Sequence, residues 1–116
     1  MFVLDASAIV AMFDAYEPLM NLWFRADRGD FPLAFPAAAI VEAGDQAGIR
    51  PTAWEPVLWS PSMKVLPLDE AAATTVSAWS GSLAVRQAIW ESEATGWPVL
   101  TCDPGQYAAE AYVLAV

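Results

Sequence analysis

Short apolar runs that alternate with longer helical patterns restrict the possible folds of this chain more than any other feature. Each run is too short for a helix, and several are continuously apolar, which is typical of strands buried on both faces of a parallel sheet. Met63–Leu68, for example, lies between proline-rich and helical segments. The pattern predicts these strands: Phe2–Leu4, Phe31–Phe35, Met63–Leu68, Val99–Thr101 and Tyr112–Val116.

The segments between these runs have helical spacing and recognisable helix ends. Pro18 opens one pattern and Gly29 ends it, while Asp69 and Ser82 stand at N-cap positions. The expected helices are Ala8–Asp14, 18–28, Ala37–Gln46, a short helix or two within Arg50–Pro61, 70–80 and Leu83–Thr95. Alternation of this kind predicts one α/β domain over residues 1–116, with three α/β/α layers around a central, mainly parallel sheet of four or five strands.

Two acidic residues, Asp5 and Asp103, follow expected strands directly. Because the carboxyl ends of parallel strands share one edge of the sheet, these side chains can face each other across a crevice where ligands bind. The alternative is that each carboxylate only caps the helix that follows it.

Composition narrows the chemistry that such a crevice can support. The chain has no histidine, so catalytic triads and histidine-bearing zinc sites are excluded. A net charge of −9 is opposite to that of an ordinary nucleic-acid binder. Carboxylates remain, and they suit hard cations such as Mg²⁺ and Mn²⁺. Cys102 is the only cysteine and is expected to be a small buried side chain; with no membrane-spanning run, we expect a cytoplasmic protein.

Three motifs in this order resemble those of PIN domains, especially VapC-like toxins of bacterial toxin–antitoxin pairs. They are Val3-Leu4-Asp5-Ala6-Ser7-Ala8, Ala39-Ile40-Val41-Glu42-Ala43-Gly44 and Gly96-Trp97-Pro98-Val99-Leu100-Thr101-Cys102-Asp103. The resemblance covers essentially the whole chain, and it implies a PIN-like fold and metal-dependent cleavage of RNA.

Carried over by position, the resemblance implies that Asp5, Glu42 and Asp103 are catalytic metal ligands for Mg²⁺ or Mn²⁺. Ser7 and Thr101 would be hydroxyls that position these ligands or water. It also implies an antitoxin protein as partner and a homodimer. The simpler alternatives are a helix cap for Ser7, an ordinary strand residue for Thr101, and a solvated acidic helix face for Glu42 with Asp45.

The chain departs from the family pattern at the helix before the last motif. The family usually has a further aspartate there, but Val85 or Ser82 stands at that place. Four carboxylates would balance two divalent cations, whereas three fall one charge short, so one ion is expected rather than two. Arg86 beside the gap could supply positive charge, while Glu91 and Glu93 are expected in solvent.

Two other features each have two interpretations. Arg25 and Arg28 share a helix face and are candidates for contacts with RNA phosphates, or they are solubilising surface charges. The six tryptophans either fill the core or form an apolar surface for a partner or a second copy. The sequence thus supports two hypotheses: a VapC-like endoribonuclease with an incomplete acidic site, or a degenerate PIN-like domain that acts through protein–protein binding.

Overall fold

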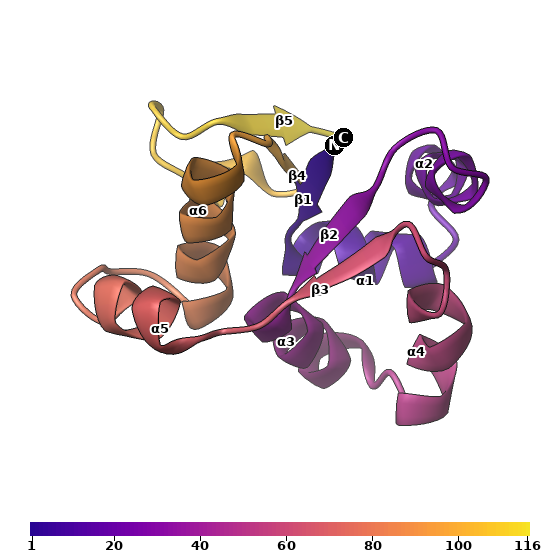
Figure 1. The fold of residues 1–116 in the computed structure, drawn as a ribbon, viewed down its shortest axis with the longest axis horizontal. Coiled ribbons are helices and arrows are strands. Elements are labelled where there is room, and N and C mark those ends of the chain that lie inside the picture. Colours follow the sequence, from indigo (N-terminus) through magenta and orange to yellow (C-terminus); the bar gives the residue numbers. More distant parts are fainter.

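A five-stranded parallel sheet organises the protein. The computed structural model describes residues 1–116 and orders the strands β3-β2-β1-β4-β5, with every neighbouring pair parallel (Figure 1). The strands are β1 (Phe2–Leu4), β2 (Leu33–Pro36), β3 (Met63–Leu66), β4 (Val99–Thr101) and β5 (Val113–Ala115). The predicted α/β class and the parallel sheet are therefore confirmed.

Helices cover both faces of this sheet, which gives the expected three layers (Figure 1). They are α1 (Ala6–Phe13), α2 (Glu17–Asp27), α3 (Ala37–Ala47), α4 (Pro51–Leu58), α5 (Glu70–Val76) and α6 (Leu83–Thr95), followed by a short 3₁₀ turn, η1 (Pro104–Gln106). None of these helices combines the length and the apolar character that crossing a bilayer requires.

Alternation along each strand separates two apolar cores. Leu4, Phe35 and Leu100 point to the face covered by α1 and α3, where the helices contribute many alanines. Val3 and Val99 point to the opposite face, where Ala88 of α6 packs on them. Alanine side chains let helix backbones approach closely, so α1 and α3 lie against each other over the sheet.

The path of the chain creates a break in strand order next to β1. After β1 the chain adds β2 and β3 on one side, then crosses over to place β4 on the other side. In an open parallel sheet this is the point where the connections on either side diverge and leave a crevice at the carboxyl ends of the strands. Asp5 follows β1 and Asp103 closely follows β4, so both predicted acids belong to this edge.

A fully buried glutamine fixes the helix α6 against this edge. The Gln87 side chain accepts a hydrogen bond from the Ala38 amide (2.8 Å) and donates one to the Leu66 carbonyl (3.0 Å). It thereby joins α6 to the first turn of α3 and to the end of β3. The Ala38 amide lies in the first turn of α3 and the Leu66 carbonyl at the end of β3, where backbone groups have no hydrogen-bond partner within the same helix or strand.

Some element boundaries differ from those predicted. Helix α1 begins at Ala6 rather than Ala8, because Asp5 is its N-cap and accepts a hydrogen bond from the Ala8 amide. Helix α5 ends at Val76, four residues before the expected end at Ser80. Helix α6 matches its prediction, since the Ser82 side chain caps it and Gly96 ends it in a left-handed conformation (φ 76°).

Candidate functional site

Asp5 is buried at the end of β1 and is held by three donors. Its Oδ1 accepts hydrogen bonds from the Ser7 hydroxyl (2.7 Å) and the Ala8 amide (2.9 Å), and its Oδ2 accepts one from the Tyr107 hydroxyl (2.8 Å). The carboxylate is only 3% exposed. Asp5 therefore caps α1, as the simpler alternative held, and also joins a longer polar network.

Ser7 and Thr101 link the start of α1 to the end of β4. Their hydroxyl oxygens lie 3.2 Å apart, although the residues are 94 positions apart in sequence. Ser7 also accepts a hydrogen bond from the Cys102 amide (2.9 Å), and Thr101 accepts one from the Asp103 amide (2.9 Å). Both hydroxyls are thus engaged with protein groups, and they position the two acids that follow β1 and β4. Ser7 is not a helix cap, since Asp5 has that role.

Asp103 lies at the exposed end of the same network. Its Oδ2 accepts a hydrogen bond from the Gln106 side-chain amide (2.6 Å), and its side chain caps no helix. The capping alternative is therefore wrong for Asp103. Asp103 and Asp5 stand at the ends of adjacent central strands, as the topology predicts.

Tyr107 is hydrogen-bonded to Asp5, and no sequence motif predicted this contact. It follows η1, packs against the core on the α6 side of the sheet and reaches Asp5 across 102 positions of sequence. Burial raises the pKa of its hydroxyl far above the ordinary value, and the charges of Asp5, Glu42 and Asp103 raise it further. The sequence carries no signal for this contact beyond the presence of an aromatic residue four positions after Asp103.

Glu42 lies on α3 and shares no hydrogen bond with the network of Asp5, Ser7, Thr101 and Asp103. It is half-exposed, and it lines an open groove of about 390 Å³ between α3 and the beginning of α6. Asp45, one turn away, is the only other charged residue in the lining. The rest of the groove is apolar and consists of Ala37, Ala38, Val41, Leu68, Leu83 and Ala84.

The first turn of α6 carries no acidic side chain. Val85 is buried and Ser82 caps the helix. Arg86 does not point to the acids, because its guanidinium donates to the carbonyls of Val76 and Trp79 near the end of α5. The possibility that Arg86 supplies positive charge to the gap is supported by no contact in the structure.

The carboxylates in this region are chemically suited to bind a hard cation, but they do not lie close enough together to do so in this structure. Carboxylate oxygens are preferred ligands for Mg²⁺ and Mn²⁺. However, no three acidic, histidine or cysteine side chains lie close enough together to hold an ion. One oxygen each of Asp5 and Asp103 already accepts a hydrogen bond from Tyr107 or Gln106. The residues thus have the chemistry of a metal site without its closed geometry.

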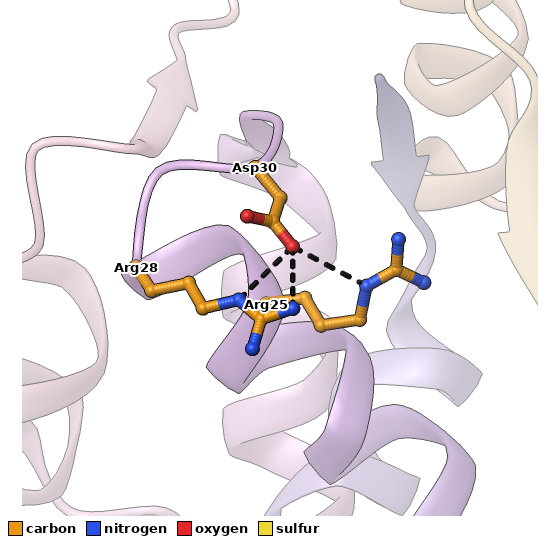
Figure 2. A network of polar contacts seen from close by, with 3 residues as sticks. All are labelled: Arg25, Arg28 and Asp30. Carbon is orange, nitrogen blue, oxygen red and sulfur yellow. Dashed lines mark hydrogen bonds and ion pairs between the residues drawn. The ribbon is translucent and has the colours of Figure 1, made fainter.

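Arg25 lies in the last turn of α2, and Arg28 follows the end of that helix. Both were candidates for contacts with RNA phosphates, and both form ion pairs with Asp30. Figure 2 shows one carboxylate oxygen of Asp30 in contact with the guanidinium of Arg28 and with the Nε atom of Arg25. The nitrogen–oxygen distances are 3.5 Å to Arg25 and 2.8 Å to Arg28. The guanidinium of Arg25 also lies 5.2 Å from the ring centre of Phe31. These are the only ion pairs in the structure, so no basic side chain neutralises Asp5, Glu42 or Asp103.

Cys102 is exposed, so the expectation that it is buried is wrong. Its amide is bound by Ser7, and this turns the thiol outward beside the C-terminal residues. Partial burial and the charge of Asp5 raise the pKa of the thiol. A raised pKa disfavours the thiolate, which is the nucleophilic and metal-binding form of cysteine.

The tryptophans lie at the edges of the core rather than in its centre. None is fully buried, and Trp59 is 75% exposed. Trp23 lines an apolar pocket of about 290 Å³ between α1, α2 and α4, together with Met12, Phe13, Ala15, Met20, Phe24, Pro56 and Val57. Trp23 and Trp54 pack against the larger core and Trp97 against the smaller one, whereas Trp59 is exposed, so core filling describes the first three and an apolar surface describes Trp59.

Comparison with known proteins identifies no family for this chain. No protein-family model matches the sequence, and no curated protein matches it significantly.

Proposed function

We propose that the protein is a PIN-like, VapC-like endoribonuclease that cleaves RNA phosphodiester bonds with Mg²⁺ or Mn²⁺ as cofactor. Asp5, Glu42 and Asp103 would hold the cation. Ser7 donates to the carboxylate of Asp5, and Thr101, in contact with Ser7, accepts from the backbone amide of Asp103.

One observation carries this proposal. Asp5 and Asp103 stand at the carboxyl ends of adjacent strands, at the break in strand order, and are joined through Ser7 and Thr101. Ligand sites of parallel α/β sheets lie at this place. The acids have neutral hydrogen-bond donors but no basic partner, and a divalent cation is the natural counter-ion for such a group.

A bound cation polarises a phosphoryl oxygen and lowers the pKa of a bound water molecule, so hydrolysis needs no histidine. The three available carboxylates favour one ion rather than two, because the position of a further acid is taken by Val85 or Ser82. In the structure Val85 is buried and Ser82 caps α6 through its hydroxyl.

The decisive experiment uses Asp103→Asn, because this side chain is exposed and its only side-chain partner is Gln106. Labelled single-stranded and structured RNAs are incubated with the protein in Mg²⁺, Mn²⁺ or chelator. We expect metal-dependent cleavage that Asp103→Asn lowers at least about 100-fold, since loss of a ligand costs no less than loss of an outer partner. Asp27→Asn, an exposed acid at the end of α2, should cleave like the parent. Equal cleavage by parent and Asp103→Asn would refute the assignment.

The proposal includes partners and a location. A cytoplasmic toxin of this class needs an inhibitor, which would be a cognate antitoxin protein, and it would form a homodimer. Exposed apolar side chains such as Phe24 and Val41 offer surface for such contacts.

A second candidate function is a degenerate PIN-like domain that binds proteins without cleaving RNA. The open arrangement of the acids favours it, as does the apolar pocket between α1, α2 and α4. The two candidates differ in the RNA experiment. Absence of cleavage in every metal, together with absence of metal binding, would leave the protein-binding function.

A further inference from the structure

The two edges of the sheet differ in how they are protected against pairing with another strand. Strand β3 forms one edge and β5 forms the other (Figure 1). The edge at β3 carries the exposed cation Lys64, which lies between Pro61 and Pro67 in sequence. Lysine and proline commonly prevent a further strand from pairing with an edge. Strand β5 and its neighbours Tyr112 and Val116 include neither residue type, so this edge is open to another strand.

The hydrogen-bond pattern of β5 leaves backbone groups free at this edge. The amide of Val116 donates to the Thr101 carbonyl, and the Tyr112 carbonyl accepts from an amide of β4, both at 2.9 Å. Because the backbone groups of a strand alternate in direction, the amide of Ala115 and the carbonyls of Val113 and Ala115 point away from β4. An extended segment that pairs with the edge is the kind of partner that satisfies such groups.

A groove of about 240 Å³ lies beside β5 on the face that α6 covers. Its lining includes the apolar side chains of Ile89 from α6 and Val113 from β5, and its only charged side chains are Glu93 and Glu110. Both acids are exposed, and neither forms an ion pair. On the opposite face of β5, Leu114 is 43% exposed. The two faces beside this edge therefore differ, one being acidic and the other apolar.

Charge distinguishes between the possible occupants of this edge. After Arg86 the chain contains no basic residue, whereas it contains Glu91, Glu93, Asp103 and Glu110. A second copy would bring the same acidic surface and a net charge of −9, so it would be repelled. A segment that carries lysine or arginine would be attracted.

We propose that an extended basic segment of a partner protein adds to the sheet as a sixth strand beside β5. Its backbone pairs with Val113 and Ala115. Every second side chain is lysine or arginine, with its aliphatic stem in the groove and its charged end at Glu93 and Glu110. The side chains between them are apolar and cover Leu114. The inference goes beyond the proposed function and does not depend on it, because the acids that follow β1 and β4 take no part.

The probe for this edge is a synthetic peptide of about six residues in which lysine and valine alternate. Its binding to isotope-labelled protein is followed by nuclear magnetic resonance at low ionic strength. We expect the amide signals of Val113 and Ala115 to shift, and the Ala115 amide to become protected from hydrogen exchange. The same peptide with every amide N-methylated keeps its charge and side chains but cannot form the ladder. It should bind at least about tenfold more weakly and protect no amide.

A proline substitution tests the edge from the side of the protein. Ala115→Pro removes the amide that faces outward and leaves the ladder to β4 intact, so peptide binding should weaken at least about tenfold. The matched control is Val65→Pro, because the Val65 amide faces the open edge of β3 by the same alternation. This variant should bind the peptide like the parent.

The acidic side of the groove is tested separately. Glu93→Gln together with Glu110→Gln should weaken binding about fivefold, since exposed ion pairs contribute little individually. Asp27→Asn together with Glu55→Gln removes the same charge from exposed positions elsewhere and should change binding less than about twofold.

Three outcomes would overturn the proposal. Equal binding of the two peptides, or of one peptide to the parent and Ala115→Pro, would show that charge alone attracts the peptide. Because the N-methylated peptide is tested on the unaltered protein, this result holds even if Ala115→Pro fails to fold. Protection of the Ala115 amide that rises with protein concentration in the absence of peptide would identify a second copy as the occupant.

Discussion

Glu91 lies in a buried environment, although its position on α6 indicated a solvent-exposed one. It was expected in solvent, but it is buried on α6, so that expectation is wrong. Burial raises the pKa of its carboxyl group, and the charge of Asp69 adds to this, while a hydrogen bond with Gln87 opposes it. Because the folded-state pKa lies above the ordinary 4.5, the group contributes stability at low pH that is lost as the pH rises through the folded-state value.

We therefore expect Glu91→Gln to raise the melting temperature at pH 7, because it removes a carboxylate that burial disfavours. The gain should shrink as the pH approaches 4, where the carboxyl group of the parent is protonated. Thermal unfolding followed by circular dichroism across this range measures both effects. Glu93→Gln on the same helix is the control, because Glu93 is exposed. A gain that does not change with pH would contradict the assignment.

At the scale of elements, Gln87 determines how α6 meets the sheet edge. Its side chain satisfies the Ala38 amide and the Leu66 carbonyl at once. Gln87→Leu leaves both backbone groups without this partner, which we expect to destabilise the protein by about 2–3 kcal/mol. Urea unfolding measures the loss. Gln46→Leu, an exposed glutamine on α3, should change stability by no more than about 0.5 kcal/mol. Equal effects of the two variants would show that the bridge contributes nothing.

At the scale of the whole molecule, charge decides how the protein responds to cations. The chain carries a net charge of −9, so any salt relieves some repulsion. Specific binding adds to this and stabilises by about 2.7 kcal/mol at a concentration one hundred times the dissociation constant. We expect millimolar Mn²⁺ to raise the melting temperature more than NaCl of equal ionic strength does, and Asp103→Asn to remove the difference. Identical shifts in the two salts would exclude a specific site.

The overall arrangement could be predicted from sequence because its signals are local. The apolar run before Asp5 and the cap and stop residues of α6, Ser82 and Gly96, each report on neighbouring residues. The contact of Tyr107 with Asp5 could not be predicted, because it depends on how β4 and η1 place a distant residue. The burial of Glu91 depends likewise on packing between elements. That the acids share one sheet edge followed from topology, whereas their spacing required the structure.

The hydroxyl contact between Ser7 and Thr101 has a consequence for the order in which the protein is made. Asp5 is synthesised before β4 and Asp103, with α1 to α6 lying between them in the chain. A nascent chain therefore carries Asp5 without its neighbour while these elements are being made. The hydroxyl contact, and with it the paired arrangement of the two acids, forms only after β4 has been synthesised.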